Sequence, residues 1–471
     1  MPVVRVVATS GINLYVNPLA RRDGDLLRCV NCISDPYGAK SKRGGYNTFL
    51  GTPDISQVNT LFSWTKNDGT SLFVYRASGS ALSYSLQGTG AWTLAGNGTI
   101  GASAHVGHAI LNDTLVICDG VGSTRHTTNG TSFTNTTLAP VAVDVEMYQN
   151  RIYANGTAST LFYSTTNDAT NWNTSGTSDS SSLNVPGEGK LLKLIKVSDK
   201  LNATKNSGLM FKWDGYSLID ASSYLGPSSP YSVDKVEGYA FWFNRLGHFG
   251  YGGAKPQLLS NAIQSQVYNS SGSAITGSTF DTISAGVHKY DYLASVGTTT
   301  DDITGETIGN AIVKYDYQKN EYLNWSFANN PTAYHSYKDA NGVQQLIFGD
   351  ANGQCYQYSG TATTDNGSAI ESVMEFMIDD GKPELEKEFE WIDVFFNPGN
   401  ECRVSVAVGD TFSKASKKWV DVGDCSSGHA EFRFSADTSR GRILFIRISE
   451  VSKNSKFVFY GMVITYREVK R

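Results

Sequence analysis

Residues 150–172, NRIYANGTASTLFYSTTNDATNW, contain the pattern from which the fold can be inferred. Side chains alternate over 151–154, and the Asn155-Gly156 dipeptide that follows favours a tight hairpin turn. A second short strand is predicted at 161–163, before a polar turn that ends at Trp172. A β unit this small cannot bury its apolar face alone, so we expect it to be one blade or layer of a larger array.

Weaker versions of this unit recur across residues 56–370, as two to four short strands separated by turns rich in Gly, Asn and Asp. At roughly 40–50 residues per blade, this region would hold about six to eight propeller blades. The spacing is irregular and carries no WD or kelch signature. Residues 257–268 (QLLSNAIQSQVY) have apolar side chains at helical spacing, which predicts a short helix between blades.

The two ends of the chain differ from this repeating region. Residues 1–55 show no regular period and include a basic, Gly-rich run, so we interpret them as an N-terminal arm. Residues 371–471 are richer in charge and contain longer alternating strands such as RVSVAV and RILFIRIS. They predict a C-terminal β-sandwich. The fold class is therefore all-β: arm 1–55, irregular β-propeller 56–370 and sandwich 371–471.

The composition agrees with β structure and restricts the function. The chain has 25 Tyr, 22 Phe and 47 Gly, and its charged residues amount to 18%, below the usual ~25%. A polar surface made mostly of uncharged side chains suits a protein that buries surface in an assembly. The net charge of −5 argues against a groove that grips DNA through its phosphates. It does not exclude DNA sliding past the protein.

The sequence also carries expectations about the compartment. The apolar run in MPVVRVVATSG is too short for a signal peptide, and no stretch approaches the ~18 apolar residues of a membrane span. Six cysteines (29, 32, 118, 355, 402 and 425) are scattered rather than grouped as in a disulfide scaffold. We therefore expect synthesis in a reducing cytoplasm.

The turn STTNDATNW (164–172) resembles the Asp-box of sialidase-type propellers, although its spacing is off by one and its glycine is missing. The Asp-box is itself a structural element, so Asp168 and Trp172 are expected to lock a turn. A sialidase site would also need several convergent arginines, which are sparse between residues 56 and 370.

Other candidate sites are weak. Cys29 and Cys32 form half of a zinc-type motif that His105 and His108 could complete in principle, and two unligated thiols are the alternative. The carboxylate pairs Asp301–Asp302 and Asp379–Asp380 lie in polar stretches where solvated charge is the usual state. We predict no catalytic residue, no cofactor and no bound metal.

A basic cluster stands out in the N-terminal region. Lys40, Lys42 and Arg43 lie among glycines in a predicted loop. They are candidates for contact with an acidic partner or with passing DNA, and the alternative is an ordinary solvated loop.

Three stretches resemble the tail hub or nozzle proteins of short-tailed bacteriophages, which are also called tail accessory or packaged-DNA stabilisation proteins. The first is the entry segment 34–49 (SDPYGAKSKRGGYNTF), and the second is 236–243 (VEGYAFWF) with the helix candidate after it. The third comprises residues 386–409 and 439–466, which are similar to the family's terminal sandwich.

This resemblance implies a structural virion protein assembled in the host cytoplasm. Copies would form a ring, a homohexamer in the family's usual sixfold form, below the portal and adaptor proteins. Tail fibre, spike or needle proteins would lie on the other side. Double-stranded DNA would pass through the lumen without sequence-specific binding, and an acidic or neutral lining would let it slide.

Two other functions stay open from the sequence. The main alternative is a glycan-binding or glycan-cleaving propeller, such as a receptor-binding or depolymerase tail protein, which would need a pocket on one propeller face. A host-type propeller scaffold is the third. Native mass would separate a sixfold ring from the trimers typical of tail fibres.

Overall fold

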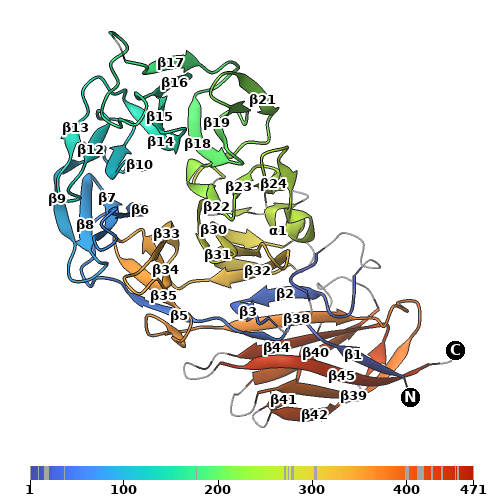
Figure 1. Ribbon diagram of the computed structural model, residues 1–471. Helices are drawn as coiled ribbons and strands as arrows, with labels where there is room; N and C mark the ends of the chain where they lie inside the picture. The colour runs from blue at the N-terminus through green and yellow to red at the C-terminus, as the bar shows by residue number, and fades with distance from the viewer. Residues whose placement is uncertain are drawn as a thin grey trace.

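The computed structural model describes residues 2–8, 10–14, 21–36, 38–176, 178–269, 272–273, 275–276, 280–301, 305–397, 402–410, 418–425, 428–435, 439–450, 452 and 456–469. It consists of a ring of β-sheets beside a β-sandwich (Figure 1). The predicted all-β propeller is therefore confirmed.

Five blades follow one another along the chain, each as a four-stranded antiparallel meander. The first contains β6 (Val58–Thr65), β7 (Leu72–Ser78), β8 (Ala81–Leu86) and β9 (Thr93–Thr99). The second contains β10 (Gly107–Leu111), β11 (Thr114–Cys118), β12 (Arg125–Thr127) and β13 (Thr134–Asn135). The third contains β14 (Ala142–Tyr148), β15 (Arg151–Gly156), β16 (Thr160–Tyr163) and β17 (Ser181–Asn184). The fourth contains β18 (Leu191–Val197), β19 (Lys200–Lys205), β20 (Met210–Trp213) and β21 (Leu218–Ser222). The fifth contains β22 (Asp234–Val236), β23 (Tyr239–Asn244), β24 (Gly247–Tyr251) and β25 (Gln257–Leu258).

The sixth separate blade closes the ring with strands from both ends of the propeller sequence. Its strands are β33 (Pro331–Lys338), β34 (Gln344–Asp350), β35 (Cys355–Ser359), β36 (Thr364–Asp365), β37 (Ser368–Ala369) and the N-terminal β5 (Gly45–Thr48). Strand β5 pairs antiparallel with β35, so that Tyr46 lies opposite Tyr358. Between the fifth blade and this closing blade lies a further sector of the ring: β29 (Ser284–His288), β30 (Asp291–Thr300), β31 (Thr307–Asp316) and β32 (Glu321–Ser326).

Aromatic side chains join one blade to the next. Phe62 and Tyr75 of the first blade stack with ring centroids 4.7 Å apart. The Tyr75 hydroxyl donates a 2.8 Å hydrogen bond to the Gly130 carbonyl of the second blade. A side chain at Gly130 would collide with the Phe73 ring, and its φ is +81°. At this contact the aromatic rings fill the space between the two blades, and the glycine allows their close approach.

The residues 150–172 are confirmed as part of one blade, but the expected Asn155-Gly156 turn is wrong. Strand β15 continues through both residues, because the buried Asn155 amide oxygen accepts a hydrogen bond from the Asp144 backbone N–H of β14. The connection between β15 and β16 comes later, at residues 157–159. The tight turn at Gln149 and Asn150, which have φ of 47° and 56°, precedes β15 and joins it to β14. The end of the stretch does lock a turn, as expected. Asp168 accepts 2.8 Å and 2.7 Å hydrogen bonds from Thr170, and the buried Trp172 donates to the Ala169 carbonyl at 3.0 Å.

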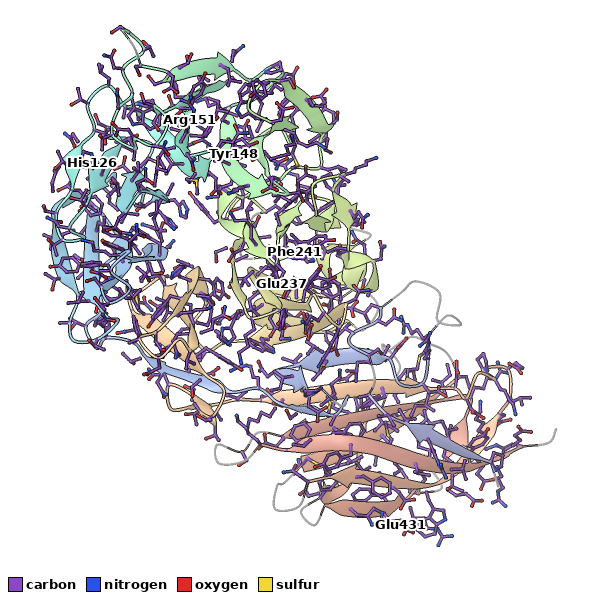
Figure 2. The ribbon with its side chains drawn as sticks, viewed as in Figure 1. His126, Tyr148, Arg151, Glu237, Phe241 and Glu431 are labelled. Atoms are coloured by element: carbon purple, nitrogen blue, oxygen red, sulfur yellow. The ribbon has the colours of Figure 1, made fainter. Side chains whose placement is uncertain are left out.

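The C-terminal region is a sandwich of two sheets. The first sheet contains β1 (Val3–Val6), β3 (Cys32–Ser34), β4 (Lys40–Lys42), β39 (Lys387–Phe396), β42 (His429–Arg433), β43 (Arg440–Gly441) and β45 (Val458–Glu468). The second contains β2 (Leu26–Val30), β38 (Ser372–Ile378), β40 (Cys402–Gly409), β41 (Val420–Cys425) and β44 (Ile443–Glu450). Alternate residues of both sheets, such as Phe376, Ile392 and Ile446, are buried in one core. Figure 2 shows Glu431 of β42 at the end farthest from the ring, whereas Tyr148 and Arg151 lie on the third blade.

The second sheet of the sandwich is continuous with the propeller. Strand β2 pairs parallel with β32 of the propeller on one side and antiparallel with β38 of the sandwich on the other. The first 55 residues are therefore no free arm. They supply strands to the sandwich and the closing blade, and β2 joins the two bodies.

The predicted helix at residues 257–268 is shorter than its periodicity suggested. It comprises the 3₁₀ turn η3 (Ser260–Ile263) and the helix α1 (Gln264–Val267), and the first two residues belong to β25. The remaining short elements are η2 (Pro230–Ser232), β26 (Tyr268–Asn269), β27 (Gly272–Ser273) and β28 (Ile275–Thr276). In the described part of the chain, no helix has the length and apolar character needed to cross a membrane.

Candidate functional site

The basic residues singled out in the N-terminal region are buried. Lys40 and Lys42 belong to strand β4 rather than to a loop. Lys40, Lys42 and Arg43 are only 1%, 0% and 0% exposed. The expected exposed loop is therefore wrong, and in this fold the three charges face carboxylates of the same chain instead of DNA or a partner.

The Arg43 guanidinium forms hydrogen bonds with several groups and lies over an aromatic ring. Its two terminal nitrogens donate to both Asp365 oxygens at 2.7 Å and 2.6 Å. Its Nε donates to Asn31 Oδ1 at 2.8 Å, and Nη2 also donates to the Ser326 carbonyl at 2.8 Å. The guanidinium lies over the Phe327 ring, 4.6 Å from its centroid. A planar, bidentate pair of this kind fixes geometry as well as charge, and this one joins the closing blade to the neighbouring sector of the ring.

The two lysines connect other parts of the molecule. Lys40 pairs with Glu321 at the start of β32, so it connects the sandwich to the propeller. Lys42 Nζ lies 2.6 Å from Glu450 Oε2 on β44 and donates to the Ser452 carbonyl at 2.6 Å, so it connects the two sheets of the sandwich. We call these three ion pairs the junction clamp. Their cations lie within four residues of sequence, and their acceptors lie in three distant segments.

The zinc hypothesis is not supported by the arrangement of its candidate ligands. Cys29 and Cys32 are buried free thiols in the core shared by β2, β3 and the sandwich, and burial raises the pKa of Cys29. His105 and His108 line a cavity inside the propeller instead. Within the residues described, no group of three or more histidine, cysteine or acidic side chains could hold a metal ion.

The carboxylate pairs have local structural roles where they can be described. Asp379 accepts a 2.8 Å hydrogen bond from the Gly381 backbone N–H, and Asp380 accepts one from the Tyr466 hydroxyl. Asp301 accepts a backbone hydrogen bond from Gly305 through its carbonyl, at 2.7 Å. Its neighbour Asp302 lies outside the described residues.

A cavity of about 300 Å³ lies on the axis of the propeller. The innermost strands of the ring line it, namely β6, β10, β14, β18, β22, β29 and β33. A second hollow of about 340 Å³ shares Asn59, His105, Tyr231, Ser284 and Thr332 with it. We call the two together the axial cavity.

Three imidazoles face the axial cavity. His105 Nδ1 lies 2.8 Å from Thr60 Oγ1, and His335 Nε2 lies 2.8 Å from Ser63 Oγ. The His108 ring stacks on Phe62 with centroids 4.5 Å apart. Burial lowers the pKa of His105 to about 3 and that of His335 to about 4, and it holds the pKa of His108 well below the usual range. All three rings are therefore neutral near pH 7.

Two ion pairs border the cavity, together with Asp234, which has no ion pair among the described residues. Lys193 Nζ lies 2.8 Å from Asp144 Oδ1, and Lys235 Nζ lies 3.0 Å from Glu146 Oε2. Burial raises the pKa of Asp144, although Lys193 opposes this shift. Burial likewise raises the pKa of Asp234, whose Oδ1 accepts a 2.7 Å hydrogen bond from the Lys235 backbone N–H.

Sequence reasoning missed most of the axial cavity. It singled out His105 and His108 only as possible zinc ligands, and it passed over His335, Lys193 and Tyr231. Each of these residues lies on or just before an innermost strand. A signal exists, because polar side chains sit within otherwise apolar inner strands. It becomes readable only once the order and register of the blades are known.

No protein-family model matches the chain, and a search of curated proteins finds no match. Solved structures with a similar course of the chain include the computationally designed Ika8 protein, at 11% identity and a TM-score of 0.40, covering 67% of this chain and 100% of that one. YCF48 from Cyanidioschyzon merolae is 10% identical with a TM-score of 0.44, over 67% of this chain and 98% of its own. YCF48 bound to D1 peptide is 9% identical with a TM-score of 0.43, over 70% of this chain and 99% of its own. These likenesses concern the fold alone.

Proposed function

We propose that this protein is a structural component of a bacteriophage tail, of the hub or nozzle type. Copies would form a closed ring that retains packaged DNA below the portal and conducts it during ejection. The observation that carries this proposal is the coupling of the propeller to the sandwich. A continuous sheet runs through β32, β2 and β38, and the junction clamp adds buried ion pairs around it.

This coupling supports a mechanical role. A hinged pair of domains meets through a separable surface, and relative motion is then the default expectation. Here β2 is hydrogen-bonded into both bodies, so relative motion would break a sheet and expose buried charges. A wall that must resist the pressure of packaged DNA needs such a rigid unit.

Exposed apolar side chains on the propeller support assembly. Large apolar residues are 65–99% exposed in the loops and outer strands of the blades, at Ile55, Leu94, Val121, Leu138, Tyr216 and Tyr224. Contacts between copies of a ring bury such residues, because interface cores are enriched in aromatic side chains and depleted in charge. The net charge of −5 supports a lumen past which DNA slides.

The oligomeric state tests the proposal. The full-length protein would be examined by native mass spectrometry, by analytical ultracentrifugation over a hundredfold range of concentration and by negative-stain microscopy. We expect a closed ring, most simply a hexamer, that does not retain double-stranded DNA in a gel-shift assay at physiological salt. A monomer at every concentration, or a threefold assembly, would overturn the proposal.

A further inference from the structure

We propose that the axial cavity is a binding site for a single neutral sugar residue, held by its three imidazoles and stacked against Tyr231. This inference does not depend on ring formation. It rests on the size of the cavity, its uncommitted hydrogen-bonding groups, its charge balance and the aromatic ring at its entrance.

The size of the cavity restricts the ligand. Its inner part measures about 300 Å³, at the lower end of the roughly 300–1,000 Å³ of small-molecule sites. The adjoining hollow of about 340 Å³ extends it past Tyr231 and Thr332. This space accommodates one saccharide ring inside and leaves room for a linked residue outside.

The imidazoles have hydrogen-bonding capacity left over. His105 and His335 each use one ring nitrogen on a hydroxyl of the protein. Among the described residues, their other nitrogens and both nitrogens of His108 have no hydrogen-bond partner. A neutral imidazole offers one donor or one acceptor at such a nitrogen. Sugar hydroxyls both donate and accept, so they match this set whichever tautomer is present.

The charge balance favours a neutral ligand over an ion. The cations Lys193 and Lys235 are already paired with Asp144 and Glu146. An anionic ligand would have to displace one of these carboxylates and lie near Asp234, whereas a cationic ligand would face both ammonium groups against Asp234 alone, the one lining carboxylate without an ion pair among the described residues. The Lys235–Glu146 pair is 42% and 23% exposed, so it keeps contact with solvent and can hydrogen-bond a hydroxyl without separating.

Tyr231 supplies a face for stacking. It lies on η2 beside both parts of the cavity, and its ring centroid is 4.4 Å from that of His105. Its side chain is 37% exposed. An aromatic ring with one free face is the usual platform for the C–H side of a pyranose.

The test uses the wild-type protein with labelled histidine, followed by NMR of the imidazoles. The probes are D-glucose, D-galactose, D-mannose, N-acetyl-D-glucosamine and L-rhamnose, with D-glucuronate and D-glucosamine as charged counterparts. We expect at least one neutral sugar to shift the His105, His108 and His335 resonances saturably, with Kd on the order of 1 mM. His126 and His248, which lie elsewhere in the propeller, should not shift.

Matched variants complete the test. Tyr231→Ala should weaken binding of the same sugar about tenfold, through loss of the stacking face. Tyr216→Ala, at a 94% exposed tyrosine outside the cavity, should leave it unchanged. The proposal is overturned if no neutral sugar shifts the three cavity imidazoles, if only the charged sugars do, or if a folded Tyr231→Ala variant binds like the wild type. Should that variant fail to fold, the wild-type shift map alone decides.

Discussion

The ion pair between Lys42 and Glu450 offers a quantitative test of the junction clamp. Both side chains are fully buried, and the ammonium also donates to the Ser452 carbonyl at 2.6 Å. The substitution Glu450→Leu keeps the volume but leaves the Lys42 charge without its carboxylate. Removing one partner of a buried pair costs about 3–5 kcal/mol, since the remaining charge is neither solvated nor neutralised. We therefore expect the free energy of unfolding to fall by about that amount.

The double variant Lys42→Met/Glu450→Leu separates this cause from ordinary repacking. It replaces both charges by apolar groups of similar size, a change that is often neutral or stabilising in other proteins. We expect it to recover most of the stability lost in Glu450→Leu, as measured by guanidinium unfolding followed by far-UV circular dichroism. With the single variant Lys42→Met measured alongside, the double-mutant cycle gives the coupling energy of the pair, which is the double variant's loss of stability minus the sum of the two single losses.

Glu388→Leu serves as the matched control on the surface of the sandwich. Glu388 pairs with Arg467 at 3.0 Å, but both side chains are exposed to solvent. Its loss should not shift the unfolding midpoint measurably, because solvent screens exposed pairs. The reasoning is refuted if Glu450→Leu behaves like this control, or if the double variant is no more stable than the single one.

Three further predictions follow from the fold. A chain that begins at Phe49 lacks all of β1 to β5 and the cations of the clamp. It should lose cooperative unfolding and be cut rapidly by trypsin, and a peptide of residues 38–50, which restores only β4, β5 and the clamp cations, should slow the cleavage in part. Trp172→Ala should cost about 3–5 kcal/mol because the buried indole fills the core between the second and third blades, whereas Asp168→Ala should cost less in the same denaturant assay. His248 is fully buried, its Nε2 has no hydrogen-bond partner among the described residues, and burial lowers its pKa from 6.5 to about 3. Below pH 6.5 the unfolded chain binds a proton at His248 that the folded chain does not bind, so the contribution of His248 to stability should fall by about 1.4 kcal/mol per unit as the pH drops from about 6.5 to about 5. His248→Phe should remove that share of the slope.

Local patterns in the sequence were enough to predict the blades and the sandwich. Both depend on short-range periodicity: alternating strands, Gly and Asn turns, and aromatic anchors such as Trp172. The residues 164–172 lock a turn through contacts within the same nine residues, so their role could be inferred without tertiary structure. The prediction of an Asn155-Gly156 turn was wrong because the Asn155 side chain accepts a hydrogen bond from the Asp144 backbone N–H on the preceding strand. Turn propensity alone does not reveal such a contact.

The predicted loop at the basic cluster was wrong for a related reason. Glycines beside Lys40, Lys42 and Arg43 suggested a solvated loop, but Gly44 and Gly45 serve close packing. An added Cβ at Gly44 would collide with the Ser359 carbonyl, and one at Gly45 with the Thr364 carbonyl. The glycines thus allow the N-terminal strand to lie against the closing blade, which brings Arg43 to Asp365. A sequence window shows that a residue is small, and only the fold shows which neighbour requires it to be small.

The partners of the N-terminal strands also determine when the fold can be completed. Arg43 is 322 residues from Asp365, and Lys42 is 408 residues from Glu450. Closing loops of this length costs entropy that is recovered only when the distant partner is in place. Until residues 355–365 exist, β5 has no strand to pair with and Arg43 has no carboxylate, and until Glu450 exists Lys42 has none. Ring closure therefore waits for residues 355–365, and the neutralisation of Lys42 within the sandwich waits for residues 443–450. Only a completed chain then presents the rigid unit that the proposed assembly requires.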